Sequence, residues 1–161
     1  MRSAVKLLVL TGLAALVLSA CSPPAGPVGG GFSSRVSEDL SGEYAPTAPV
    51  TVGGQALEGL YLGHADDFAA FERGERVPGF APVMLMLGGE RVLPTAYRVT
   101  DETVNFEGQA GRMAVRLEAR IDLDALAEAR RTLGDDSPVL SGTLRVGGEQ
   151  AAVAFSRASG G

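Results

Sequence analysis

The sequence has little of the chemistry on which most metal centres and active sites depend. Its 161 residues include one cysteine, one histidine and no tryptophan. Zinc sites draw three or four ligands from histidine, cysteine and carboxylate side chains. Nucleophilic catalysis pairs a serine or cysteine with a base that is usually histidine. We therefore expect no metal, no cofactor and no catalytic residue, and we expect that the protein is not an enzyme.

Two further absences concern membrane spans and nucleic acids. The longest apolar stretch, residues 7–18, is broken by Thr11 and Gly12, and it is shorter than the roughly 20 residues with which a helix crosses a bilayer. Basic residues are not in excess, since 14 lysines and arginines stand against 19 aspartates and glutamates and the formal net charge is −5. Binding of nucleic acid needs a basic patch that contacts phosphates, so we expect no nucleic acid among the partners.

The first 20 residues have the order of features found in a secretory signal peptide. Arg2 and Lys6 are followed by the apolar stretch and then by the small pair Ser19-Ala20, which is the pattern of a charged region, an apolar region and a cleavage site. The only cysteine, Cys21, comes directly after them. Leu18-Ser19-Ala20-Cys21 resembles the lipobox of bacterial lipoproteins, and the resemblance implies cleavage before Cys21 and lipid on its sulfur. The alternative is an ordinary secretory signal.

The lipobox resemblance implies an anchor and a location in the cell envelope. A lipid-modified Cys21 leaves neither a free thiol nor a disulfide, so burial alone would hold the domain together. Two acyl chains suffice for stable anchoring, which makes the membrane a partner through Cys21. An aspartate after the cysteine often marks inner-membrane retention in such lipoproteins, so Ser22 favours the outer membrane, with the protein facing the periplasm. Loss of Arg2 and Lys6 leaves 12 basic and 19 acidic residues, a net charge of −7.

Residues 21–48 are expected to be the lipidated cysteine and a tether. Residues 22–31 contain three prolines and four glycines, and such a composition does not form a packed core. Residues 32–49 are ambiguous. Four apolar residues recur at helical spacing, as in a short amphipathic helix, whereas three nearby serines and a glycine disfavour one: Phe32, Val36, Leu40 and Tyr44 against Ser33, Ser34, Ser41 and Gly42. The single small β-rich domain is expected to span residues 49–161. A domain of about 110 residues is large enough to bury a core without metals or disulfides.

Beyond residue 48 the chain alternates strand patterns with turns that contain glycine. The apolar run Val83–Leu87 is typical of a strand buried on both faces. Residues 65–73 and 123–133 have helical spacing, acidic residues near the start and a following glycine, and Asp122 or Asp124 can cap the second helix. The fold class is therefore α+β, with a mainly antiparallel sheet of about six to eight short strands, curled or closed into a partial barrel, and two short helices.

Residues 112–121 carry the sharpest surface pattern in the chain. Apolar and polar side chains alternate over these ten positions, which predicts a strand with one buried and one wet face. Arg112, Arg116 and Arg120 share the wet face with Glu118. Guanidinium groups clamp carboxylates and phosphates, so these arginines are candidate contacts for another envelope protein or an envelope polymer. The alternative is a solvated strand face with local ion pairs.

Other candidate residues have a functional and a structural interpretation. His64, before Asp66, is either a metal ligand or the residue at which a helix begins, and Ser137, beside Asp135, is either a nucleophile or a loop residue. Six apolar residues either line a cavity or fill the core: Phe68, Phe71, Phe80, Met84, Met86 and Met113. The favoured function is a membrane-anchored lipoprotein with a non-catalytic interaction or assembly domain. The alternative is a carrier or binding module for a small apolar ligand or lipid.

Overall fold

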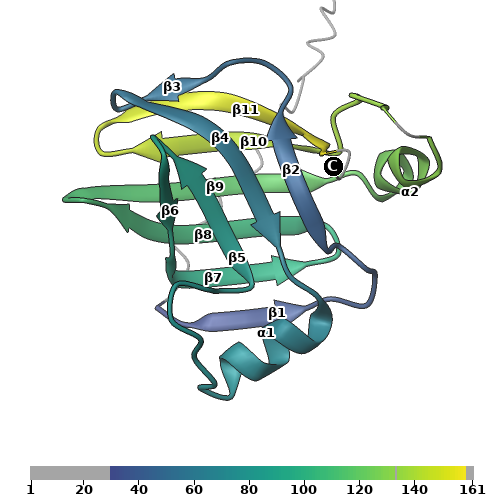
Figure 1. Ribbon diagram of the computed structural model, residues 1–161, viewed down its shortest axis with the longest axis horizontal. Helices are drawn as coiled ribbons and strands as arrows, with labels where there is room; N and C mark the ends of the chain where they lie inside the picture. The colour runs from purple at the N-terminus through teal and green to yellow at the C-terminus, as the bar shows by residue number, and fades with distance from the viewer. Residues whose placement is uncertain (1–29, 133, 159–161) are drawn as a thin grey trace, which may run out of the picture.

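The computed structural model describes residues 30–132 and 134–158, so the expected signal peptide and Cys21 lie outside the described residues. Within that part the chain forms eleven strands and two helices (Figure 1). The strands are β1 (Phe32–Arg35), β2 (Gly42–Pro46), β3 (Thr51–Val52), β4 (Gln55–Leu62), β5 (Val83–Leu87), β6 (Glu90–Val92), β7 (Pro94–Thr100), β8 (Thr103–Ala110), β9 (Met113–Ile121), β10 (Leu140–Val146) and β11 (Glu149–Arg157). The helices are α1 (Ala65–Glu72) and α2 (Leu123–Arg131). Neither of them has the length and apolar character that a membrane-crossing helix requires.

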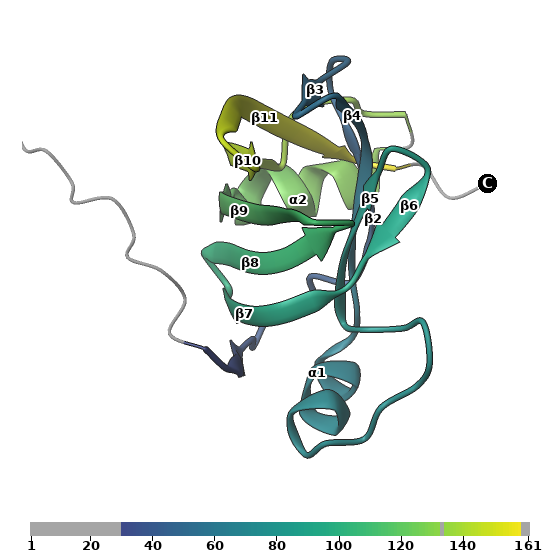
Figure 2. The same cartoon turned by 90° about the vertical axis from the view of Figure 1, so that its left-hand side faces the viewer.

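The strands form one sheet that curls into a half-barrel. Its order is β1-β7-β8-β9-β10-β11-β2-β4-β5-β6, with β3 paired to β4. The pairing of β1 with β7 is parallel and the others are antiparallel. Figure 2 shows β7 to β11 as one wall and β2, β4, β5 and β6 as the other. The mainly antiparallel sheet, its curl and the two short helices are confirmed, whereas six to eight strands is too low a count.

The undercount arises in part from the segment expected to be a tether. Phe32–Arg35 pairs with β7, and Gly42–Pro46 lies between β11 and β4. Tyr44 is 1 % exposed, and its hydroxyl donates to the carbonyl oxygen of Leu40 at 2.6 Å. Residues 32–46 therefore contain two strands rather than a short helix, and the expected domain start near Pro49 is too late. Backbone hydrogen bonds to strands far along the chain order this serine- and glycine-containing segment, and its own composition does not reveal them.

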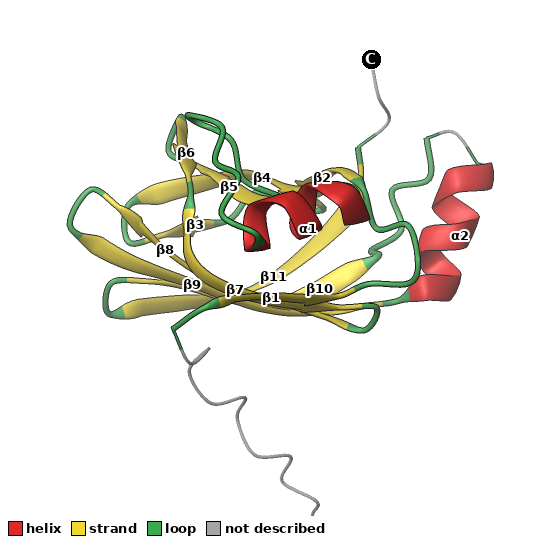
Figure 3. Ribbon diagram, turned by 90° about the horizontal axis from the view of Figure 1, so that it is seen from below, coloured by secondary structure: helices red, strands yellow, loops and turns green. Residues whose placement is uncertain are grey.

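Helix α1 lies across the open side of the half-barrel, between the two walls (Figure 3). Its buried residues are Phe68 and Phe71. The ring centroids of Phe68 and Tyr97 are 5.5 Å apart, and those of Phe71 and Phe32 are 5.0 Å apart. Both pairs pack edge to face. Such aromatic pairs add about 0.5–1.5 kcal/mol beyond the area that they bury. The helix thus fastens the parallel edge strand β1 to the core.

Apolar side chains fill the space inside the sheet. The largest fully buried ones come from both walls and from α1: Tyr44, Tyr97, Phe68, Phe106, Phe155, Leu40, Leu60, Leu62, Leu85, Leu87, Leu117 and Leu140. Of the six residues expected to line a cavity or fill the core, Phe68, Phe71 and Met84 are buried in the core. Phe80 and Met113 are partly buried and pack against it, and Met86 on β5 is half-buried. Phe68, Phe71 and Met84 therefore fill the core, which is the second of the two interpretations.

The alternation predicted for residues 112–121 is present in β9. Val115, Leu117 and Ala119 point into the core and are buried, and the side chains between them are exposed or half-buried. The strand begins at Met113, so Arg112 belongs to the preceding turn. Helix α2 follows, and Asp122 is its N-cap because its Oδ1 accepts a hydrogen bond from the backbone N–H of Ala125 at 2.9 Å.

Candidate functional site

The three arginines expected on one strand face occupy different surroundings. Arg112 is exposed in the turn between β8 and β9. Arg116 lies in the middle of β9, and its Nη2 is 2.7 Å from Oε1 of Glu107 on β8, with the two side chains 31 % and 23 % exposed. Arg120 is exposed near the end of the strand. The structure therefore keeps Arg116 and Arg120 on one strand face and gives Arg116 a local ion pair.

Strand pairing brings three more arginines to the same surface. Residues of β1 align with β7 and residues of β10 with β9, so that Ser33 lies opposite Arg98 and Arg145 opposite Arg116. We call the outer surface of β1, β7, β8, β9 and β10 the arginine face, after its five arginines: Arg35, Arg98, Arg116, Arg120 and Arg145.

Two of the three added arginines, Arg98 and Arg145, lie in alternating patterns from which their outward position could have been predicted. Arg98 stands between the buried Tyr97 and Val99, and Arg145 stands between the apolar pair Leu144 and Val146. Such alternation places the charged side chain on the outer face of a strand. The sequence does not say that the strands carrying these arginines are neighbours, because that depends on the topology of the sheet.

Four depressions indent the arginine face or its margin, and each is lined by at least one of its arginines. The largest, about 760 Å³, lies between the end of β9, α2 and β10 and is lined by Arg120 together with Glu102, Asp122 and Asp124. A second, about 360 Å³, is lined by Arg116 and Arg145, and a third, about 320 Å³, by Arg35 and Arg98. The fourth, about 300 Å³, again includes Arg120. The surface therefore offers guanidinium groups at several separate places.

A fifth depression, about 350 Å³, lies beside α1 and is mostly apolar. Val77 and Leu93 line it, and they are the large apolar side chains that stay exposed in the described chain, at 62 % and 39 %. The guanidinium carbon of Arg76 lies 3.7 Å from the ring centroid of Phe71 and 5.1 Å from that of Phe32. These are cation–π contacts, so the one arginine in this depression is held against aromatic rings.

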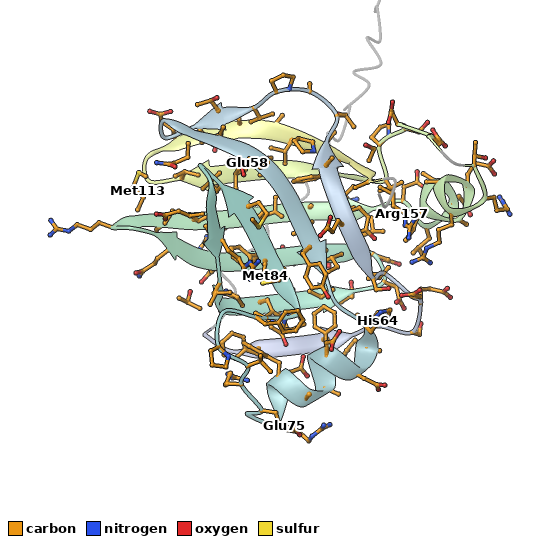
Figure 4. The ribbon with its side chains drawn as sticks, viewed as in Figure 1. Glu58, His64, Glu75, Met84, Met113 and Arg157 are labelled. Atoms are coloured by element: carbon orange, nitrogen blue, oxygen red, sulfur yellow. The ribbon has the colours of Figure 1, made fainter. Side chains whose placement is uncertain are left out.

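His64 lies at the start of α1 with an exposed side chain (Figure 4). Its backbone N–H donates to Oδ2 of Asp67 at 2.9 Å, and its Nδ1 is 3.9 Å from Oδ1 of Asp39. No group of three or more histidines, cysteines and carboxylates that could hold a metal occurs within residues 30–132 and 134–158. His64 thus has the position of a residue that begins a helix.

Ser137 belongs to the loop between α2 and β10. Its backbone N–H donates to Oδ1 of Asp135 at 2.9 Å. Hydrogen bonds from the side chain and backbone of Ser137 lower the pKa of Asp135. The contact is the local turn that an aspartate forms with its own chain two residues on.

Two buried tyrosines have strongly shifted pKa values. Burial raises the pKa of Tyr44 to about 12. Burial also raises the pKa of Tyr97, whose hydroxyl lies 3.2 Å from Oε1 of Glu72, and the neighbouring carboxylate adds to the shift. Both phenols therefore stay protonated at neutral pH and serve as hydrogen-bond donors inside the fold.

The fold and the surface together define a small curled antiparallel half-barrel, closed by one helix, with an arginine-lined outer face. Comparisons with protein-family models, with curated proteins and with solved structures returned no match. Function is therefore inferred from the residues of this chain.

Proposed function

We propose that this protein is a membrane-anchored lipoprotein of the bacterial cell envelope whose domain is a non-catalytic interaction module. The anchor is supported by the order of features in residues 1–20 and by the position of the only cysteine, Cys21. The apolar stretch is too short to span a bilayer, so stable attachment rests on lipid at Cys21. Ser22 stands where an aspartate often marks inner-membrane retention, and it therefore supports a location in the outer membrane.

The observation that carries the interaction role is the arginine face. The interior of the sheet is occupied by the protein's own apolar side chains, whereas the outer surface presents arginines in four depressions. Arginines recognise carboxylates and phosphates through planar, multiple hydrogen bonds. An anionic envelope component is thus the kind of partner that this surface fits.

Fractionation of bacterial cells that express the full chain tests the anchor. The wild-type chain is expected with the membranes and Cys21→Ala in the soluble fraction, because the variant has no sulfur to receive lipid. Ser22→Ala is the matched control and is expected to stay with the membranes. The membranes are washed at high salt, which screens electrostatic contacts but leaves a lipid anchor in place; retention of Cys21→Ala after this wash would show that the anchor lies elsewhere.

A photo-reactive side chain introduced into the full chain tests the contact surface. Thr143 lies on β10 within the arginine face, and Asp66 lies exposed on α1 on a different surface. Irradiation of intact cells is expected to give adducts with an envelope component from position 143 and few from position 66. Equal labelling from both positions would contradict the assignment of the surface.

A second candidate function is the binding of a small apolar ligand, which the depression beside α1 favours. Its exposed Val77 and Leu93 would be covered by such a ligand. Native mass spectrometry of the protein purified from its host is expected to detect a bound small molecule, and Leu93→Asp is expected to release it. A single unliganded mass for the wild-type chain would remove this candidate.

A further inference from the structure

The arginine face carries positive charge on a protein that is acidic as a whole. Of the 19 acidic residues, Glu107 and Glu118 are the two whose side chains alternate onto this face, against five arginines. Four further carboxylates lie at its margin: Asp101 and Glu102 in the turn between β7 and β8, and Asp122 and Asp124 beside the end of β9. The face therefore has three positive charges in excess, whereas residues 21–161 carry a net charge of −7.

Most of this positive charge has no acidic partner in the described chain. Arg35, Arg98 and Arg120 form no ion pair and no side-chain hydrogen bond with residues 30–132 or 134–158. Arg145 donates through Nε to Oε1 of Gln150 at 3.0 Å. It also lies directly opposite Arg116 on the neighbouring strand, and like charges in that position destabilise a sheet. An external anion would relieve this repulsion.

The arginines are distributed over several strands, which indicates a partner with many anionic groups. Arg35 on β1 and Arg120 on β9 are three strand spacings apart, or about 14 Å. Each of the four depressions holds at least one guanidinium group. A single phosphate or carboxylate would fill one depression only, whereas a surface of repeated phosphates can reach the arginine pairs of two separate depressions, Arg35 with Arg98 and Arg116 with Arg145, as well as Arg120.

The path of the chain brings one such surface close. The described chain begins at Gly30, and β1, with Arg35, is the edge strand of the arginine face. Cys21 precedes Gly30 by nine residues, which span at most about 30 Å. This step rests on the proposed function, since it takes Cys21 as the site of the lipid. A bilayer that holds the lipid would then lie within reach of the face.

We propose that the arginine face docks on the anionic phospholipid headgroups of the membrane that holds the Cys21 lipid. The five guanidinium groups bind headgroup phosphates. Arg35 and Arg98 contribute most, because they form no ion pair within the described residues and no carboxylate lines the depression that they share. Docking sets the orientation of the domain: β1, β7, β8, β9 and β10 face the bilayer, and the wall formed by β4, β5 and β6 faces away from it.

Flotation with lipid vesicles tests this docking without using the anchor. The protein is the chain 21–161 with Cys21→Ala, which contains every described residue and cannot carry lipid. Vesicles of phosphatidylethanolamine with roughly 30 mol % phosphatidylglycerol provide the anionic surface, and vesicles of phosphatidylcholine provide the neutral one. The bound fraction is expected to be about tenfold higher on the anionic vesicles and to fall with added salt, because surface electrostatics are screened.

Charge reversal locates the contact. The variant Arg35→Glu, Arg98→Glu and Arg120→Glu changes exposed side chains that form no ion pair within the described residues. It is expected to reduce binding to the level seen with neutral vesicles. The matched control reverses the same number of charges on other surfaces, at Arg73, Arg91 and Arg131, and is expected to lose little binding. Far-ultraviolet circular dichroism and thermal unfolding establish that both variants are folded.

Three results would overturn the docking. They are equal binding of the wild-type chain to both kinds of vesicle, equal loss of binding in the two triple variants, and no vesicle binding combined with cross-linking of the arginine face to an acidic envelope protein. None of these results bears on lipid attachment at Cys21, which the fractionation of Cys21→Ala tests separately. Failure of anchoring with retained vesicle binding would conversely leave the docking surface in place.

Discussion

Gly142 shows how closely two strands of the curled sheet approach each other. It lies on β10 opposite Ala119 of β9. A Cβ atom at this position would be 2.0 Å from the carbonyl oxygen of Glu118 and 2.6 Å from the Cα of Ala119. Both are backbone atoms that cannot rotate away. A glycine inside a strand indicates such an approach, but the sequence alone does not identify the strand that comes close.

The substitution Gly142→Ala is expected to lower the free energy of unfolding by about 1–3 kcal/mol, because the added methyl group overpacks the contact between β9 and β10. Urea denaturation measures the change. Gly148→Ala is the control, since nothing lies within 4 Å of the corresponding Cβ position, and a change within about 0.5 kcal/mol is expected there. Equal effects of the two substitutions would contradict this account of the strand contact.

Tyr44 makes stability depend on pH in the alkaline range. Its pKa is raised from 10.0 to about 12, chiefly by burial, so the folded state holds the phenolic proton more tightly than the unfolded state. The stabilisation is therefore complete below pH 10 and is lost as the pH rises from 10 to about 12. In Tyr44→Phe the free energy of unfolding should fall less steeply over that range.

At neutral pH, Tyr44→Phe is expected to cost about 1–2 kcal/mol, because the buried carbonyl of Leu40 loses its donor. Chemical denaturation at a series of pH values measures both effects. Parallel pH profiles of the wild-type and variant proteins would show that Tyr44 is not the group that titrates.

At the scale of elements, the parts of the fold with strong local patterns could be predicted from the sequence. The apolar run of β5, the strict alternation of β9 and the helical spacing of α1 all have local causes, and the structure contains each of them. The hairpin of β10 and β11 could also be predicted from its local sequence, because Gly147 in its turn supplies a positive φ of 59°. These elements carry their own hydrophobic period and turn residues.

The elements that could not be predicted depend on partners distant in the sequence. Strand β1 is held by a parallel pairing with β7, more than 60 positions later, and β2 by pairings with β11 and β4. The same limit applies to the candidate site, because Arg35, Arg98 and Arg145 join Arg116 and Arg120 only through the register of the sheet. Local composition carries no information about that register.

Truncation tests whether the segment expected to be a tether belongs to the domain. A chain that begins at Gly30 keeps β1 and β2 and is expected to unfold at the same temperature as residues 21–161. A chain that begins at Pro49 loses β2, which links β11 to β4, and it also loses the buried Tyr44. We expect it to show no cooperative thermal transition by circular dichroism. A cooperative transition in the shorter chain would place the domain start after β2.

At the scale of the whole molecule, charge and chain path point to the same surface. The protein is acidic as a whole. Its net charge does not show that five arginines lie on one face of the sheet, and this separation of charge follows only from the fold. The described chain enters the sheet at the edge that carries Arg35. An anchor nine residues before Gly30 and a cationic face beside the entry strand would act together, one supplying attachment and the other orientation.

The intact mass of the protein extracted from the membranes of its host tests the central proposal, lipid attachment at Cys21, most directly. The predicted result is the mass of residues 21–161 plus a diacylglyceryl group and any further acyl chain, with the added mass on the N-terminal peptide after proteolysis. A chain that begins at Cys21 with an unmodified thiol, or one that still begins at Met1, would contradict the proposal.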